Sequence, residues 1–298
     1  MIFSKIAAVL LRLAIAALLA LTVAFVAAGD EKVSADTEDR PIVVATTTQA
    51  ADLARNAGGG AVEVVGLLAP NADPHDYEVR PRDLRMLADA DLVVRSGGDL
   101  DEWLQEAIKG AGAHARVLTL SDHVQRLDDD PHWWQDPRNA ERAVAAIARA
   151  LNTDAAPYLE RLRRLDRAVA ACLDAVPRAQ RKLVTTHDAL GYYARRYGIE
   201  VVGAVIPSLS TRGQPSAGET AELVRTIRRE GVDAIFAESS VNAKVEAAIA
   251  RETGAEIGRP LWADTLGPSG SDGARYIASI ESNTKAIADG LGAVACGF

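Results

Sequence analysis

The sequence predicts an α/β protein with two lobes, each built around a parallel β-sheet, and one long helix that joins them. Three observations support this prediction. Short apolar runs alternate with amphipathic stretches of helical length, which is the pattern of parallel βαβ units. This pattern occurs twice, with a long amphipathic stretch between the two occurrences. With 298 residues, the chain exceeds the usual size of a single domain.

The first lobe is expected over residues 29–153. Apolar, β-branched runs predict its strands, and apolar residues at every third or fourth position predict its helices. Pro81 suits the first turn of a helix, and the glycines at 58–60 suit the end of one. The predicted strands are 41–46, 62–68, 91–95 and 115–120, and the predicted helices are 49–56, 81–90, 100–109 and 138–151.

The stretch 154–176 predicts the helix that joins the lobes. Asp154 provides a start signal, and Pro177 stops the pattern. At 1.5 Å per residue, such a helix extends about 30 Å. A long amphipathic helix is often an ordinary core helix, but its place between two βα regions makes it a candidate connector. Its apolar positions are Tyr158, Leu159, Leu162, Leu165, Val169, Cys172, Leu173 and Val176.

The second lobe is expected over residues 177–298, where the alternation of strand and helix patterns resumes. Glycines at 198, 231 and 254 stand where helices should end. The segment 207–218 is rich in glycine and proline and is expected to be a long, mobile loop. The predicted strands are 182–186, 199–204, 233–237 and 260–263, and the predicted helices are 189–197, 219–230, 243–253 and 273–291.

Residues 1–28 have the layout of a secretory signal peptide. Lys5 and Arg12 precede an apolar run that ends in small residues, and cleavage is expected near Ala28. The run is slightly short for a spanning helix of about 20 residues, and an uncleaved anchor is the alternative. No cysteine follows the run. We therefore expect a periplasmic or otherwise extracytoplasmic protein that is not a lipoprotein.

Charge and cysteine content argue against two further classes of function, nucleic-acid binding and cysteine-based redox or metal chemistry. The chain has 33 basic against 41 acidic side chains, and loss of the signal peptide would make it more acidic still. An acidic surface argues against a nucleic-acid partner. Cys172 and Cys296 lack the CxxC spacing of a redox or metal motif. In an exported protein they could form a disulfide, or they could be two unpaired, packed cysteines.

Three histidines and one aspartate are candidate metal ligands. His75 and His132 each follow an Asp-Pro pair, and proline stiffens the loop that presents the imidazole. His187 and Asp264 each follow a predicted strand. Open parallel sheets bind ligands at the carboxyl ends of their strands, so these four side chains are expected to converge. Taken singly, each histidine could instead be an ordinary hydrogen-bonding side chain, as we expect for His114 and His123 at the surface.

Several motifs together resemble the zinc/manganese solute-binding proteins of bacterial ABC importers, over nearly the whole chain after the signal peptide. The motifs are DPHDYE at 73–78, DL at 83–84, ADLVV at 90–94, DPHWWQDP at 130–137, THDALGYY at 186–193 and ADTLG at 263–267. The resemblance implies two Rossmann-like lobes bridged by one rigid helix, with a single metal ion in the cleft between them. It also implies metal ligands at the matching positions, which are His75, His132, His187 and Asp264.

The ligand set favours zinc, Zn²⁺, as the transported ion. Three imidazoles and one carboxylate suit tetrahedral zinc, whereas manganese prefers more oxygen donors. Manganese members of the family carry a carboxylate where His187 stands. Manganese or another divalent metal remains the alternative cargo. The histidine-rich loop of many zinc members is absent between His75 and His132, so an auxiliary collecting loop is not expected.

The main rival from another class is a zinc-dependent hydrolase. Catalytic zinc keeps an open position for water, whereas a capture site closes its shell with a fourth protein ligand. In a hydrolase, Asp264 or Glu238 would serve as general base. We expect capture and no enzymatic activity. The implied partners are an inner-membrane ABC permease and its ATPase, with a periplasmic metallochaperone as a further candidate, and the protein is expected to be a monomer.

Overall fold

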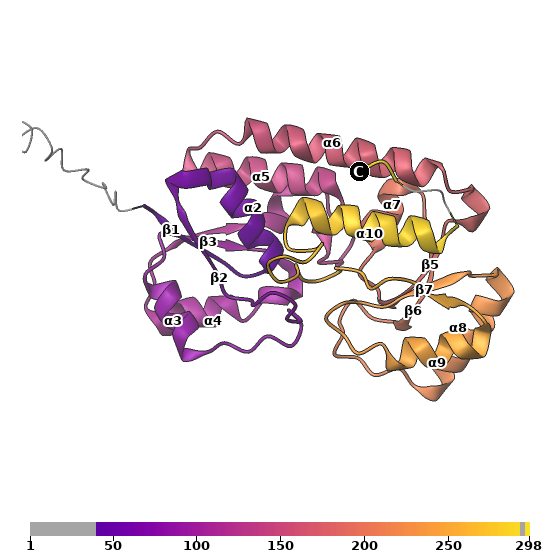
Figure 1. The fold of residues 1–298 in the computed structure, drawn as a ribbon. Helices are drawn as coiled ribbons and strands as arrows, with labels where there is room; N and C mark the ends of the chain where they lie inside the picture. Colours follow the sequence, from indigo (N-terminus) through magenta and orange to yellow (C-terminus); the bar gives the residue numbers. More distant parts are fainter. Residues whose placement is uncertain (1–39, 293–295) are drawn as a thin grey trace, which may run out of the picture. The chain divides into compact units, whose positions relative to one another are not determined.

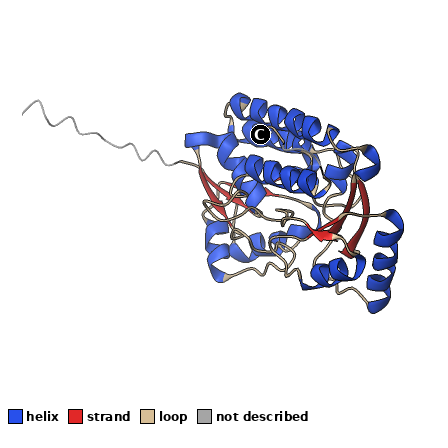
Figure 2. Ribbon diagram, turned by 45° about the vertical axis from the view of Figure 1, so that its right-hand side comes forward, coloured by secondary structure: helices blue, strands red, loops and turns tan. Residues whose placement is uncertain are grey.

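The computed structural model describes residues 40–292 and 296–298 (Figure 1). It contains two four-stranded parallel sheets, with strand orders β2-β1-β3-β4 and β6-β5-β7-β8. Figure 2 shows the strands as two separate groups with helices around each. The prediction of two parallel-sheet α/β lobes is confirmed. The predicted signal peptide lies outside the described residues.

The first sheet has short strands whose two faces are both covered. Its strands are β1 (Ile42–Ala45), β2 (Glu63–Gly66), β3 (Leu92–Arg95) and β4 (Arg116–Thr119). Successive side chains of a strand point to opposite faces. Val43 accordingly packs with α2 (Thr48–Gly58) and α5 (Pro137–Leu151), whereas Val44 packs with α3 (Pro81–Ala88) and α4 (Leu104–Ala111). Burial on both faces explains why the central strands β1 and β3 are largely apolar in the sequence, whereas the edge strands β2 and β4 are more exposed.

The second sheet repeats this construction. Its strands are β5 (Lys182–His187), β6 (Glu200–Ile206), β7 (Ala234–Phe236) and β8 (Glu256–Ile257). Val184 and Ile235 pack with α8 (Ala217–Glu230) and α9 (Lys244–Thr253). Leu183 and Phe236 belong to the large cluster that includes residues of α7 (Gly191–Tyr197) and α10 (Tyr276–Gly290).

One predicted strand is wrong. Residues 260–263 form no strand, and the edge of the second sheet is β8 at Glu256–Ile257 instead. Leu261 pairs with Glu238 as a single isolated bridge. Pro260 has no N–H to donate to a ladder. The backbone groups of Trp262 are bonded to a side chain and not to a neighbouring strand. The N–H of Trp262 donates to Asn283 Oδ1 at 2.8 Å, and its carbonyl accepts from Asn283 Nδ2 at 2.9 Å.

Three helices lie side by side above the sheets in Figure 1. They are α5, α6 (Ala156–Asp174) and α10, and α6 packs against both of the others. Buried residues from all three helices and from both sheets form one continuous apolar cluster. A disulfide joins Cys172 of α6 to Cys296, with Cα atoms 5.1 Å apart, so the two cysteines are not unpaired.

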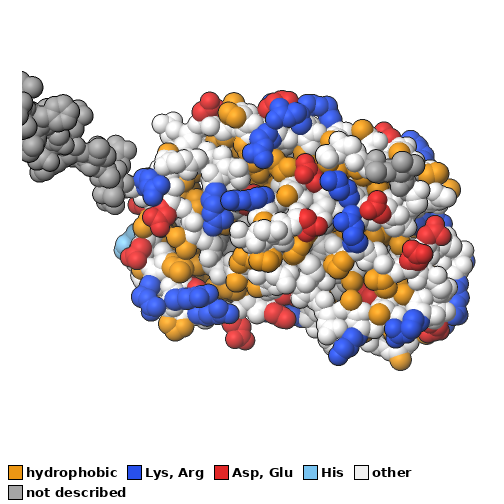
Figure 3. Space-filling model, viewed as in Figure 1, with side chains coloured by type: hydrophobic (Ala, Val, Ile, Leu, Met, Phe, Trp, Pro, Cys, Tyr) orange, Lys and Arg blue, Asp and Glu red, His pale blue; other side chains and the backbone are white. Residues whose placement is uncertain are grey.

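Short 3₁₀ helices complete the described chain. They are η1 (Gly59–Ala61), η2 (Gly98–Asp101), η3 (Leu120–His123), η4 (Trp133–Gln135) and η5 (Arg178–Gln180). No helix within the described residues is both long and apolar enough to cross a membrane. The face shown in Figure 3 carries basic and acidic side chains in close proximity. Ion pairs such as Arg163–Glu141, at 2.7 Å, link α6 to α5 at the surface.

Leu162→Ala tests how far the fold depends on the burial of α6. Leu162 is 1% exposed within the cluster shared by both sheets. The substitution should lower the free energy of unfolding by about 2–5 kcal/mol, because it removes buried methyl groups and leaves a cavity. Urea unfolding followed by circular dichroism measures this change. Val117→Ala, at a position 47% exposed, is the control and should change stability by less than about 0.5 kcal/mol. Equal effects of the two substitutions would contradict the packing described.

Candidate metal centre

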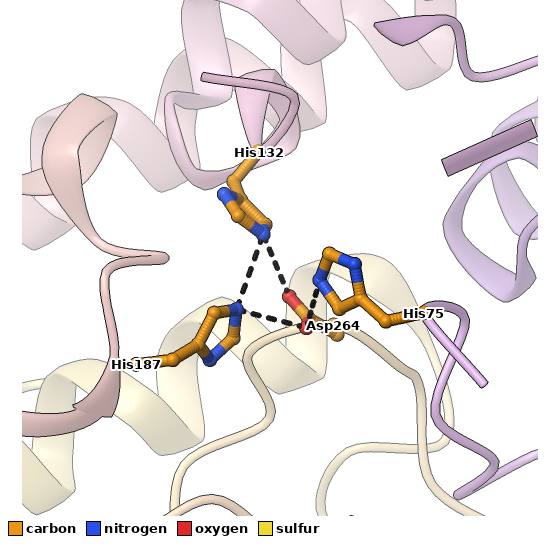
Figure 4. Close-up of side chains that lie close together, drawn as sticks. All are labelled: His75, His132, His187 and Asp264. Carbon is orange, nitrogen blue, oxygen red and sulfur yellow. Dashed lines mark hydrogen bonds and ion pairs between the residues drawn. The ribbon is translucent and has the colours of Figure 1, made fainter. Parts of the chain in front are cut away.

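Four side chains from distant parts of the sequence meet between the two sheets (Figure 4). His75, His132, His187 and Asp264 each offer one ligand atom, and these atoms all lie within 4.8 Å of one another. His75 is 6% exposed, and the other three are fully buried. The structure thus brings together all four predicted site residues. His114 and His123 are exposed and lie outside the group, as expected.

The Asp264 carboxylate lies at the centre of the cluster. Its Oδ2 is 3.2 Å from the Nε2 atoms of both His75 and His187, and its Oδ1 is 3.3 Å from Nε2 of His132. The Nε2 atoms of His132 and His187 are themselves 3.3 Å apart. Both oxygens of Asp264 and the Nε2 of His75 are buried, and none makes a hydrogen bond of good geometry within the described chain. Atoms that face a common point without bonding one another are suited to hold one cation.

The two Asp-Pro-His motifs fold in the same way. Asp73 Oδ1 accepts a hydrogen bond of 2.9 Å from the backbone N–H of His75, and Asp130 Oδ1 accepts one of 2.9 Å from that of His132. An aspartate that bonds the backbone two residues ahead forms an Asx turn. The proline between the two residues fixes φ, so each turn holds its histidine in a defined direction. These local contacts explain why the motif presents an imidazole.

Carboxylates orient two of the three imidazoles. Nδ1 of His132 lies 2.7 Å from Asp130 Oδ1, and Nδ1 of His187 lies 2.5 Å from Glu238 Oε1. An Nδ1–H that donates to a carboxylate leaves the Nε2 lone pair free for a metal ion. Glu238 also accepts the backbone N–H of His187 at 3.1 Å. The structure therefore places Glu238 as the support of His187.

The segment around Asp264 is held by residues that the sequence did not single out as ligand supports. The carbonyl of Ala263 accepts hydrogen bonds from Trp134 Nε1 at 2.8 Å and from Gln135 Nε2 at 2.7 Å. The backbone N–H of Leu266 donates to Thr48 Oγ1 at 2.8 Å. Each of these contacts joins positions more than 120 residues apart, and no local pattern signals such pairings. Together they fix the backbone on both sides of Asp264.

The charges in the cluster shift its protonation equilibria strongly. Burial lowers the pKa of His187, but the Asp264 and Glu238 carboxylates outweigh it and raise that pKa to about 11. Burial raises the pKa of Asp264, but the nearby imidazoles of His187 and His132 hold it well below its usual range. Burial raises the pKa of Glu238. In the metal-free protein, His187 is therefore an imidazolium between two acidic groups.

This arrangement leaves little room for hydrolytic chemistry. A zinc hydrolase needs a carboxylate that stands off from the metal beside a water position. Asp264 instead turns both oxygens toward the three imidazole nitrogens. Glu238 is occupied by the ring and the backbone of His187. Neither candidate base has the position that the hydrolase alternative requires.

Comparison with known proteins agrees with the fold. The chain matches the family model described as "ZnuA: Zinc-uptake complex component A periplasmic" over residues 43–290. It is 31% identical over 287 residues to the zinc-binding protein TroA of Treponema pallidum, covering 88% of this chain and 92% of TroA. It is 30% identical over 301 residues to the manganese-binding lipoprotein MntA of Bacillus subtilis, covering 93% and 98% of the two chains. The solved structure of periplasmic TroA aligns with a TM-score of 0.78 at 29% identity, over 85% of this chain and 99% of that one.

These relatives contradict one expectation about localisation. MntA is named a lipoprotein, and so is the manganese ABC transporter substrate-binding lipoprotein PsaA of Streptococcus pneumoniae, which is 26% identical over 284 residues. The expectation that the chain is not a lipoprotein is therefore wrong by this comparison. It rested on the lack of a cysteine after the apolar run, in a part of the sequence outside the described residues. A periplasmic or otherwise extracytoplasmic location is consistent with the family description.

The protonation of His187 predicts that metal binding releases a proton. The metal-free protein keeps this proton up to the raised pKa of about 11, and a divalent ion such as Zn²⁺ must displace it from Nε2. Apparent affinity should thus fall as pH falls, by about tenfold per pH unit between pH 9 and 7. Calorimetric titration in buffers of different protonation enthalpy should count about one proton released per ion. Affinity that stays constant over this range would contradict the charge arrangement.

Proposed function

Since the chain belongs to the family of periplasmic zinc-uptake components, we propose that it captures zinc with high affinity outside the cytoplasm and delivers it to an ABC permease. Members of this family are metal-binding, periplasmic components of ABC importers and work with a permease and its ATPase. They are substrate-binding proteins and not enzymes, so the chain is not an enzyme. The hydrolase alternative is thereby set aside.

The donor set is the observation that supports zinc. Three imidazole nitrogens and one carboxylate face a common point, and all four groups are buried. Zinc is commonly four-coordinate with nitrogen and oxygen ligands, whereas manganese favours a shell richer in oxygen. The names of the relatives do not decide the cargo, because TroA is named for zinc and MntA for manganese. Manganese or another divalent ion is thus the competing assignment.

We assign His75, His132, His187 and Asp264 as the four ligands of the transported ion. His75 and His132 belong to the part of the chain before α6, and His187 and Asp264 belong to the part after it. An ion held by all four would bridge the two lobes and neutralise Asp264. A shell closed by four protein ligands leaves no position for an activated water, which fits capture and release of the ion.

We also propose the lobe boundaries, the oligomeric state and a candidate zinc donor. We propose lobes at residues 29–153 and 177–298, with 154–176 as the joining helix, and α6 falls within that last range. We propose that the protein acts as a monomer and that a periplasmic metallochaperone is a candidate donor of zinc. Delivery to the permease would require the ion to leave a buried site, so exchange of the ion is a step that the protein must control.

Metal titrations of wild-type and substituted proteins test the proposed function. Wild type should bind one zinc ion per chain and bind it more tightly than manganese, as the donor set favours. His187→Ala and Asp264→Ala should each weaken zinc binding by more than about 100-fold. Loss of a residue that only hydrogen-bonds to a metal ligand already lowers metal affinity by about 10–100-fold, and loss of a ligand should lower it further. Competition with a chromophoric chelator measures these affinities.

His123→Ala is the matched control, because His123 is exposed and lies outside the cluster. Its zinc affinity should equal that of wild type. Tighter binding of manganese than of zinc would contradict the assignment of the cargo. Zinc affinity that is unchanged in His187→Ala and Asp264→Ala would contradict the assignment of the site.

A further inference from the structure

His75 is the least restrained of the four proposed ligands. The imidazoles of His132 and His187 are each held at Nδ1 by a carboxylate, and both side chains are fully buried. Asp264 is fully buried as well, and hydrogen bonds to Ala263 fix the backbone before it. The ring of His75 has no such carboxylate at Nδ1 within the described chain, and His75 alone of the four retains some exposure, at 6%.

A cavity of about 350 Å³ reaches His75 from the surface. Pro74 and His75 line it from the loop between β2 and α3, and Ser210 and Arg212 line it from the loop between β6 and α8. The other three proposed ligands do not line it. The remaining lining residues belong to the first lobe and are Tyr77, Asp99, Leu100, Glu102 and Trp103. An ion that moves between solvent and the centre along this cavity would pass His75 first.

A hydrogen bond between the two loops holds the position of His75. The Thr211 hydroxyl donates to Asp73 Oδ2 at 2.6 Å, while Oδ1 of the same carboxylate accepts the backbone N–H of His75 at 2.9 Å. Asp73 therefore connects His75 in one lobe to Thr211 in the other, across 138 residues of sequence. The Thr211–Asp73 contact is partly buried, and hydrogen bonds to charged groups are stronger than those between neutral groups.

The adjacent ion pair between the loops contributes less. Arg212 Nε lies 3.5 Å from Asp76 Oδ1, and both side chains are more than 60% exposed. Exposed pairs of this kind have small effects on stability because solvent screens them. The loop that carries Thr211 forms no helix or strand between the end of β6 at Ile206 and the start of α8 at Ala217. The Thr211 hydroxyl is thus the main polar link by which this loop can restrain His75.

We propose that the metal ion enters and leaves past His75 through this cavity, and that Thr211 and Asp73 are positioning residues that set the rate of exchange. The inference rests on the proposed function and deepens it. While Thr211 holds Asp73, the His75 turn stays closed over the centre. When that hydrogen bond breaks, His75 can leave while His132, His187 and Asp264 stay in place.

Zinc dissociation rates test this proposal. Zinc-loaded protein is mixed with excess chromophoric chelator in a stopped-flow instrument, and the release rate is compared among variants. Thr211→Val keeps the shape of the side chain but removes the hydroxyl, and it should release zinc about tenfold faster, as loss of one charge-assisted hydrogen bond implies. Thr211→Ser keeps a hydroxyl and should restore the wild-type rate. Asp73→Asn should also accelerate release, because it weakens both hydrogen bonds of the carboxylate.

Gln214→Ala is the matched control on the same loop. The Gln214 side chain is exposed and does not line the cavity, so its truncation should leave the release rate unchanged. The melting temperature of metal-free Thr211→Val should fall by no more than about 4 °C, as the loss of one hydrogen bond allows in a chain of this size, which separates positioning from general destabilisation. Equal release rates in Thr211→Val and wild type would overturn the proposal while the capture function stands. A wild-type protein that takes up no zinc would overturn the capture function and this inference with it.

Discussion

The interaction on which the centre of this protein depends is the approach of three imidazoles to one buried carboxylate. Asp264 is fully buried, and Nε2 atoms of His75, His132 and His187 lie 3.2–3.3 Å from its oxygens. A buried carboxylate without hydrogen bonds is costly unless positive charge lies beside it. That charge is carried by a protonated imidazole or by a metal ion. Because the imidazoles come from both lobes, neutralising Asp264 also ties the lobes together.

The rest of the fold holds the four ligand side chains with unequal rigidity. The carboxylates of Asp130 and Glu238 orient two imidazoles, and Trp134 and Gln135 hold the backbone before Asp264. Behind the site, one apolar cluster contains residues of both sheets and of the helices α5, α6 and α10. Separating the lobes would expose part of that cluster. The hydrogen bond between the loops that carry Asp73 and Thr211 can break without that cost, so loop movement is the less expensive route to the ion.

Sequence patterns predict the parts of this architecture that depend on local or repeated signals. Continuous apolar runs such as 42–45 and 92–94 predict buried parallel strands, and the Asp-Pro-His motifs predict stiff turns because their Asx hydrogen bonds are local. The placement of the candidate ligands at strand ends indicates that they converge. The family resemblance, which the comparisons confirm, rests in addition on the order of the motifs along the chain.

Contacts between distant residues could not be predicted in this way. The run 260–263 has the composition of a strand, but the Asn283 side chain takes both backbone groups of Trp262, and nothing near Trp262 in the sequence signals this. The same holds for the contact of Thr48 with Leu266 and for Glu238, which the sequence suggested as a general base and which the structure places against His187. Such side-chain partners depend on tertiary packing, which periodicity does not encode.

The most direct test of the central claim is X-ray absorption spectroscopy at the zinc edge of the loaded protein. The account predicts a shell of four nitrogen and oxygen atoms at about 2.0 Å, as in closed zinc sites. Outer-shell scattering should correspond to three imidazoles in the wild type and to two imidazoles in His187→Ala. A wild-type shell with fewer than three imidazoles, or an imidazole count that His187→Ala leaves unchanged, would contradict the claim that these side chains hold the ion.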